Sequence, residues 1–131
     1  MDIEACRDSI RRAVAFFKKY FPNIKPVAIN CHSWIFSPNL SEFMAPESNL
    51  VSFTKELYLY PIDSSCQDGI WFFFYQDKFD SKTAPRTSSL QKSIAEHLEA
   101  GKDLRIGGMF FLLEDAENFG SQFYKNNYPE L

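Results

Sequence analysis

The chain has 131 residues, of which 45% are hydrophobic and 24% charged, as is ordinary for one soluble globular domain. The formal net charge is −3 and no basic stripe appears, which argues against a protein that binds the phosphate backbone of nucleic acids. The aromatic share of 17% is high and includes 14 phenylalanines, so large flat side chains are buried in a core or left for a partner or ligand.

The hydrophobic pattern predicts helices and strands along the chain. Apolar residues recur at three- and four-residue steps where we expect helices, and they alternate with other residues where we expect strands. In chain order, the expected elements are helix 2–21, strand 26–36, short helices 38–44 and 50–55, strands 56–62 and 70–76, helix 88–100 and strand 104–113. This order predicts an α+β (α/β-like) fold with a small mixed, mainly antiparallel sheet flanked by helices.

Two of these segments carry further signals. Segment 70–76 contains Trp-Phe-Phe-Phe-Tyr and is apolar on both faces, which favours a central strand paired with strand 56–62 as a hairpin. The pair Gly107–Gly108 lies inside the last strand, where glycine indicates a bulge or a group that approaches the backbone closely. We expect a further helical piece in the tail, 114–131.

Cys31 and His32 are adjacent in strand 26–36. Their side chains therefore point to opposite faces, and the two residues by themselves do not form a nucleophile–base pair. Cys31 is interpreted as a small buried apolar residue. His32 shares its face with Asn30 and Trp34, a mixture of hydrogen-bonding groups and apolar surface that suits the wall of a pocket. The alternative for His32 is a core histidine bonded to a backbone carbonyl.

Two expected helix starts carry groups that attract anions. Ser48 and Asn49 precede helix 50–55, where backbone amides are free to bind an anion. Arg86 lies just before helix 88–100, where an arginine and hydroxyl groups would hold a phosphate or carboxylate. The simpler reading of both segments is a helix cap beside a solvated loop.

Several kinds of site are disfavoured. The three cysteines Cys6, Cys31 and Cys66 are widely spaced, and with two histidines and no C-x-x-C motif we expect no metal. The sequence holds no P-loop, no G-x-G-x-x-G and no Ser-His-Asp signature. No signal peptide precedes the first helix and no apolar run approaches the roughly 20 residues of a bilayer span, so we expect a cytoplasmic protein without a membrane partner.

Three blocks of the sequence resemble a known family. They read FFKKYFP, CHSWIFSPNLSEFMAPESNLVSF and PRTSSLQKSIAEHLEAGKDLRIGGMFF, and the match runs over about 2–112. This frame resembles the C-terminal domain of bacterial GNAT-like acyltransferases, whose most specific parts are the Cys-His-Ser-Trp strand and the Thr-Ser-Leu-Gln helix start. Members of the family carry another domain before the equivalent of Asp2. We therefore expect 1–131 to be a single domain that corresponds to their C-terminal half, with the tail 114–131 outside the resemblance.

The resemblance implies a GNAT-like fold and transfer of an acyl group from acyl-coenzyme A, as co-substrate, to a small-molecule acceptor. We expect this acceptor to be an amine. In that reaction His32 would act as the base and Tyr58 or Tyr60 as the acid. The residues assigned to acceptor binding are Asn30, Trp34, Ser48, Asn49 and Arg86.

A second interpretation is a non-catalytic domain that binds a ligand or partner and needs a separate N-terminal half or a second copy. The general GNAT pyrophosphate loop, Arg/Gln-x-x-Gly-x-Gly/Ala, is not found, because RIGGMF opens a strand rather than a helix. The aromatic load would then include an exposed interface.

Overall fold

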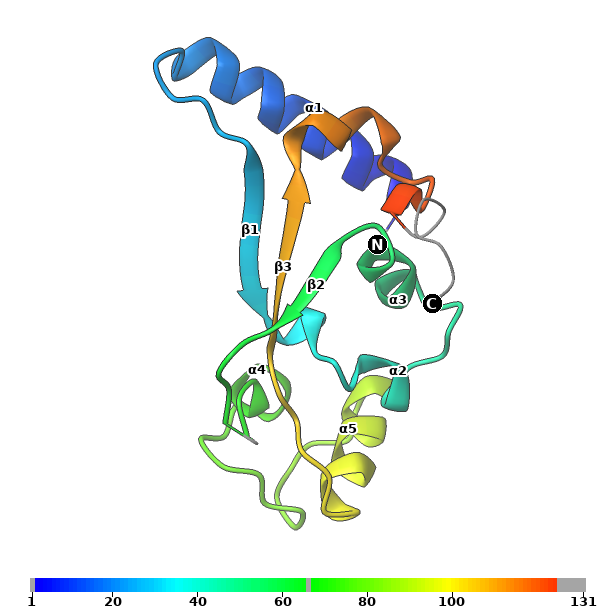
Figure 1. The fold of residues 1–131 in the computed structure, drawn as a ribbon. Coiled ribbons are helices and arrows are strands. Elements are labelled where there is room, and N and C mark those ends of the chain that lie inside the picture. Colours follow the sequence, from blue (N-terminus) through cyan, green and yellow to red (C-terminus); the bar gives the residue numbers. More distant parts are fainter. Residues whose placement is uncertain (1, 66, 125–131) are drawn as a thin grey trace. The chain divides into compact units, whose positions relative to one another are not determined.

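The structure is a computed structural model that describes residues 2–65 and 67–124. Its strands β1 (Ala28–Ser33), β3 (Gly107–Leu112) and β2 (Tyr58–Pro61) are hydrogen-bonded in that order. The central strand β3 runs antiparallel to its two neighbours (Figure 1). The helices are α1 (Ile3–Tyr20), η1 (Trp34–Phe36), α2 (Leu40–Phe43), α3 (Asn49–Thr54), α4 (Ile70–Phe74), α5 (Ser89–Glu99) and η2 (Leu113–Asn118). The predicted fold class, helices with a small antiparallel sheet, is confirmed.

The chain divides into two compact units. Unit 1 comprises Met1–Cys31, Glu47–Leu59 and Met109–Leu131, and unit 2 comprises His32–Pro46 and Tyr60–Gly108. By residue number, each of the three strands begins in one unit and ends in the other.

Unit 1 contains α1, α3 and η2. Asp2 caps α1 by accepting a hydrogen bond from the Glu4 amide at 3.0 Å, so the predicted helix 2–21 is confirmed to within a residue at each end. Phe111 and Phe119 pack edge to face with their ring centroids 5.4 Å apart. The buried apolar residues of unit 1 are Val51, Leu57, Met109, Phe111, Ala116, Phe119 and Tyr124.

Unit 2 is built around α5. The predicted capping box is confirmed, since the Ser88 hydroxyl accepts from the Gln91 amide at 3.1 Å and Gln91 Oε1 accepts from the Ser88 amide. The Gln91 side chain also donates to the Phe73 carbonyl at 2.8 Å, which ties α5 to α4. The core residues of unit 2 include Ile70, Phe73, Phe74, Ala84, Ile94, Ala95 and Leu104.

The prediction of a strand at 70–76, and of a hairpin with 56–62, is wrong. The segment forms helix α4, and β2 pairs with β3 instead. Within α4 the buried residues are Ile70, Phe73 and Phe74, which follow a helical period of three and four. The apolar residues between them are left exposed, and this made the segment look apolar on both faces.

The prediction that a group approaches the backbone at the glycine pair is confirmed. A Cβ atom at Gly107 would lie 1.9 Å from the backbone oxygen of Phe36. A Cβ atom at Gly108 would lie 2.5 Å from the ring of Tyr60. Real Cβ atoms do not approach other atoms so closely, so both positions require glycine for space rather than for an unusual φ.

Candidate functional site

The structure brings two of the predicted catalytic residues together. The Nε2 atom of His32 lies 2.8 Å from the hydroxyl oxygen of Tyr60, a hydrogen-bond distance, and the two rings meet edge to face. Both residues belong to unit 2. His32 is exposed and Tyr60 is half-buried, so the pair combines an accessible imidazole with a phenol. Such a pair can accept, donate and pass a proton.

The surroundings of His32 correct two expectations. Its exposure contradicts the alternative of a core histidine. Cys31 is exposed too, so its interpretation as a buried residue is wrong. The physical reason is that β1 is an edge strand, and the run from Asn30 to His32 is uncovered on both faces. Asn30 is therefore also at the surface.

Trp34 does not continue the strand. Strand β1 ends at Ser33, whose hydroxyl accepts from the Ile35 amide and starts the 3-10 helix η1. The indole of Trp34 packs edge to face on Phe73 with a centroid distance of 4.6 Å, at the margin of the unit 2 core. The predicted shared strand face of His32 and Trp34 therefore does not form.

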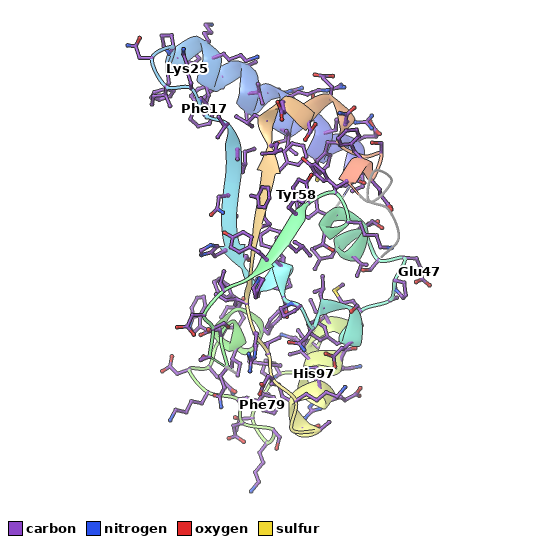
Figure 2. All side chains as sticks on the ribbon, in the orientation of Figure 1. Phe17, Lys25, Glu47, Tyr58, Phe79 and His97 are labelled. Atoms are coloured by element: carbon purple, nitrogen blue, oxygen red, sulfur yellow. The ribbon has the colours of Figure 1, made fainter. Side chains whose placement is uncertain are left out.

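Tyr58 is part of an aromatic cluster in unit 1. Its ring stacks on Phe110 at 4.6 Å, and the centroid of Tyr124 lies 3.7 Å away. All three rings belong to unit 1 (Tyr58 is labelled in Figure 2). Burial, together with the hydrogen bond to Asp115, raises the pKa of Tyr124 far above its ordinary value. We assign Tyr58 to packing.

The two predicted anion sites are occupied by local structure. The Ser48 hydroxyl caps α3 by accepting from the Val51 amide at 3.2 Å, and Asn49 is the first residue of that helix. The Arg86 guanidinium pairs with the Glu99 carboxylate, with Nη2 and Oε1 2.5 Å apart. The hydrogen bond that Arg86 donates to Glu99 raises the pKa of Arg86 above its ordinary value. The simpler readings of these segments therefore account for their geometry.

His97 has the environment that was considered for His32. It lies on α5, where Figure 2 labels it, and is buried; its Nε2 lies 2.8 Å from the Asp103 carbonyl oxygen. A carbonyl only accepts hydrogen bonds, so Nε2 of His97 must carry a proton. Its ring also packs edge to face on Phe43. His97 is thus a core histidine with its hydrogen bond made.

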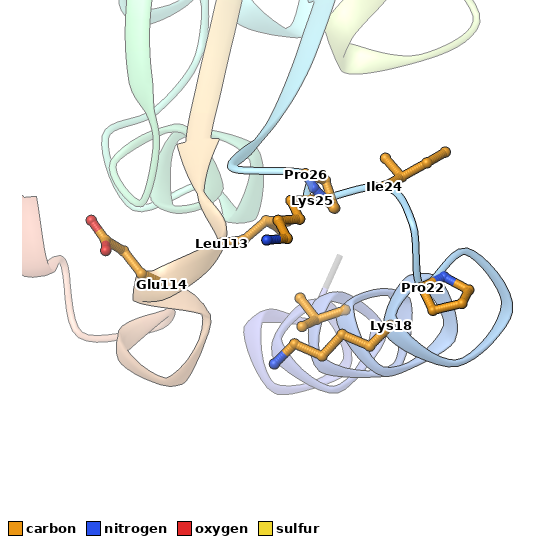
Figure 3. A pocket seen from close by; sticks show the side chains of 8 residues that line it. Lys18, Pro22, Ile24, Lys25, Pro26, Leu113 and Glu114 are labelled. Atoms are coloured by element: carbon orange, nitrogen blue, oxygen red, sulfur yellow. The ribbon is translucent and has the colours of Figure 1, made fainter.

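Unit 1 holds a cavity of about 440 Å³ between the C-terminal part of α1 and the segment that follows β3 (Figure 3). Its lining is largely apolar, with Val14, Ile24 and Leu113 among others, and its charged residues are Lys18, Lys25 and Glu114. Figure 3 shows the Lys25 side chain extending toward Leu113. A volume of this size takes a small ligand, and an apolar wall beside two lysines suits an anionic amphiphile.

A surface of exposed apolar side chains surrounds the end of α1. We call it the α1 aromatic surface, and its residues are Phe16, Phe17, Tyr20, Phe21, Ile24 and Val27. Their exposed fractions run from 42% at Phe21 to 76% at Val27. The aromatic rings contact one another, as with Phe16 and Tyr20, whose centroids are 4.8 Å apart. Phe17 and Lys25 are labelled near the C-terminal end of α1 in Figure 2.

The sequence did not identify two residues that shape these environments. Gly108 was noted only as part of a pair, although its lack of a side chain makes room for Tyr60. The sequence did not indicate Glu99 as the partner of Arg86, because a separation of 13 residues across a loop and a helix does not predict an ion pair. Only the glycine pair carried a signal that could be read.

Within 2–65 and 67–124, no group of three or more His, Cys, Asp or Glu side chains is arranged to hold a metal ion. No helix in those same ranges combines the length and apolarity needed to cross a membrane. Cys6 and Cys31 are not in a disulfide, and Cys66 lies outside the described residues.

The chain was compared with known families and structures. The sequence model of the GNAT-like C-terminal domain family matches residues 1–111. A comparison with curated proteins gives no match. The fold is similar to that of an acyltransferase in complex with CoA and 10C-teicoplanin, with a TM-score of 0.76 and 24% identity over 86% of this chain and 37% of that one.

Two further solved structures are similar. One is a mutant acyltransferase in complex with octanoyl-CoA, with a TM-score of 0.75 and 23% identity over 86% of this chain and 36% of that one. The other is an acyltransferase in complex with decanoyl-CoA, with a TM-score of 0.70 and 26% identity over 79% of this chain and 33% of that one. The chain thus spans little more than a third of the proteins that it resembles, and the likeness is one of fold.

Proposed function

The chain belongs to the GNAT-like C-terminal domain family, and we propose that it serves an acyltransferase that moves an acyl group from a coenzyme A thioester to an amine. The observation that carries the proposal is the hydrogen-bonded pair of His32 and Tyr60, which lies inside the matched range 1–111. The similar acyltransferases with octanoyl-CoA and decanoyl-CoA support the choice of a medium-chain acyl-CoA as co-substrate.

The reaction requires the protein mainly to accept one proton and to donate another. A C–N bond forms and the C–S bond of the thioester breaks, while the amine loses one proton and the leaving thiolate gains one. We assign the first transfer to His32 as base and the second to the Tyr60 hydroxyl as acid. The hydrogen bond between Nε2 and the tyrosine oxygen would let the imidazole return its proton to the phenol, so the proton count balances.

We further propose that the cavity of unit 1 receives part of the co-substrate. Lys18 and Lys25 would pair with phosphate groups, while the apolar lining that includes Val14 and Leu113 would contact an uncharged portion. Coenzyme A combines these two kinds of surface. This assignment would supply phosphate contacts in a chain that lacks the general pyrophosphate loop.

The first test is calorimetric titration of the chain with coenzyme A and with octanoyl-CoA. We expect binding at micromolar Kd, weakened at least about tenfold by combined Lys18→Ala and Lys25→Ala substitutions, equivalent to 1.4 kcal/mol or more. Lys92→Ala, an exposed lysine on α5, is the matched control and should bind as the wild type does. No heat at millimolar ligand would reject binding by this chain.

The second test concerns His32. Release of free thiol from octanoyl-CoA is followed over a panel of primary amines, and His32→Ala should lower the rate of transfer by about a hundredfold or more. Lys92→Ala again serves as the control. Unchanged turnover in His32→Ala would remove His32 as the base even if the titration showed binding.

A second candidate function rests on the α1 aromatic surface. Phe16, Tyr20 and Val27 expose half or more of their area, although the helix that carries two of them is strongly amphipathic. A non-catalytic domain whose surface is covered by a separate N-terminal half, or by a second copy, would explain that exposure. Binding of octanoyl-CoA by the chain alone would favour the acyltransferase, and concentration-dependent self-association without such binding would favour this alternative.

A further inference from the structure

The pair of His32 and Tyr60 is joined across a strand rather than between neighbours. His32 lies on β1 and Tyr60 on β2, while the sheet order is β1-β3-β2. Adjacent strands are about 4.8 Å apart, so the two outer strands are roughly 10 Å apart. The two side chains must therefore lean over β3 to reach a separation of 2.8 Å (strand order in Figure 1).

The residue of β3 beneath Tyr60 is Gly108. A Cβ atom at this position would lie 2.5 Å from both Cε2 and Cζ of the Tyr60 ring, and 3.0 Å from Cγ2 of Ile62. The Cζ atom carries the hydroxyl that meets His32. Any side chain at position 108 would thus push the phenol away from the place where its hydroxyl makes the contact, and Ile62 restricts the room for escape.

We propose that Gly108 is the position that permits Tyr60 to hold His32, and that Tyr60 orients the imidazole in addition to its proposed role as the acid. The catalytic meaning of this arrangement rests on the proposed function, but the arrangement itself does not. His32, Tyr60 and Gly108 all lie in unit 2, so the inference depends on that unit alone.

The hydrogen bond has a defined consequence for the histidine. The Tyr60 hydroxyl can donate to Nε2 or accept from it, so the contact can form in either tautomer of the neutral ring. It restricts the rotamers of a side chain that is exposed to solvent. A base held in one orientation presents its other nitrogen, Nδ1, in a constant direction.

Ring 15N NMR of the histidine-labelled chain tests this directly. The sequence has two histidines, so two ring systems appear. His97 is an internal reference in the same unit, because its Nε2 must carry the proton that it donates to the Asp103 carbonyl. In the wild-type chain the Nε2 signal of His32 should have the shift of a nitrogen hydrogen-bonded to a protein group, at a pH where the ring is neutral.

Two substitutions should remove that hydrogen bond by different routes. Tyr60→Phe deletes the hydroxyl, and Gly108→Ala displaces the ring, so each should shift the Nε2 signal of His32 toward that of a solvent-exposed imidazole while the nitrogens of His97 stay unchanged. The double variant should add no further shift, because both changes break the same contact. Tyr75→Phe, at a tyrosine that is 75% exposed on the same unit, is the matched control and should change neither histidine.

Other outcomes overturn the inference. An unchanged His32 spectrum in Tyr60→Phe would show that the hydroxyl does not hold the imidazole. A shift of the His32 signal in Tyr60→Phe but not in Gly108→Ala would reject the role of Gly108. If Gly108→Ala also altered His97, the change would be a general loss of structure, and Tyr60→Phe would decide the matter alone.

Transfer kinetics separate this inference from the proposed function. Where octanoyl-CoA is consumed, Gly108→Ala should lower kcat about tenfold with little change in KM, the effect of one hydrogen bond worth about 1.4 kcal/mol. Tyr60→Phe should lower kcat further, because it also removes the hydroxyl proposed as the acid. Both should also change the pH profile, which a purely structural residue would not do. A chain without transfer activity but with the expected NMR response would reject the proposed function and retain the positioning contact.

Discussion

The carboxylate of Glu56 offers a measurable test of how unit 1 is held together. It is only 4% exposed, and it accepts the Gly120 amide at 2.8 Å and the Gln122 amide at 3.0 Å. Both residues have positive φ values, +95° and +52°, and the second is unfavourable for a residue with a side chain. The turn that follows η2 therefore depends on an acceptor supplied from beside α3.

We expect Glu56→Ala to lower the free energy of unfolding by about 3 kcal/mol. Each of the two hydrogen bonds to a charged group contributes roughly 1.5 kcal/mol, and the amides are left without their acceptor. Glu56→Gln keeps one carbonyl oxygen and the side-chain shape, so about 1 to 1.5 kcal/mol should be lost.

Urea unfolding followed by far-UV circular dichroism measures these changes, since unit 1 contains the long helix α1. Tryptophan fluorescence is a separate probe because Trp34 and Trp71 both belong to unit 2. Glu117→Gln is the matched control, because that carboxylate pairs with Arg11 at the surface and its loss should cost less than about 0.5 kcal/mol. The reasoning is refuted if Glu56→Gln costs no more than Glu117→Gln.

Three further predictions follow from local geometry. Gly107→Ala should lower the free energy of unfolding by about 3 kcal/mol or more, because its Cβ would overlap a rigid backbone oxygen. Gly101→Ala, where there is open space but φ is +75°, should lower it by about 1 kcal/mol. Equal losses of the two variants in urea unfolding would contradict this reasoning. Hydrogen bonds from neighbouring serines lower the pKa of Asp68, so its stabilising effect is present above about pH 3.9 and is lost as the pH falls through the lower folded-state pKa. Asp68→Asn should weaken that acid-side dependence, and an identical urea midpoint profile would reject it. Combined Phe16→Ser and Tyr20→Ser should abolish any self-association seen by sedimentation, and unchanged sedimentation would place that contact elsewhere.

The helices that the sequence predicted best are those whose ends carry their own chemistry. Asp2 caps α1 and the Ser88–Gln91 pair caps α5, and these signals lie within a few residues of the backbone groups that they satisfy. Strand pairing leaves no comparable local signal in the sequence. The length and aromatic content of segment 70–76 fit a strand and led to that prediction, whereas its buried positions follow the helical period.

The sequence predicted individual residues of the site but not the contacts between them. His32 and Tyr60 were each identified from residue type and from the family resemblance, but their hydrogen bond joins strands that are not neighbours in the sheet. Arg86 was assigned to an acceptor because a sequence shows the charge of a side chain and not its partner, which is Glu99. The exposure of Cys31 followed from the edge position of β1, which also depends on strand order.

The glycine pair shows how a local signal becomes a specific one only when the sheet is assembled. From the sequence, Gly107 and Gly108 both indicate that some group approaches the backbone. In the structure the two positions differ in consequence, because Gly107 faces the backbone of Phe36 and Gly108 faces the movable ring of Tyr60. A methyl group at the first must disturb the chain path, while one at the second can be accommodated by moving a side chain. We therefore expect position 107 to control stability and position 108 to control the orientation of His32, although the same residue type stands at both.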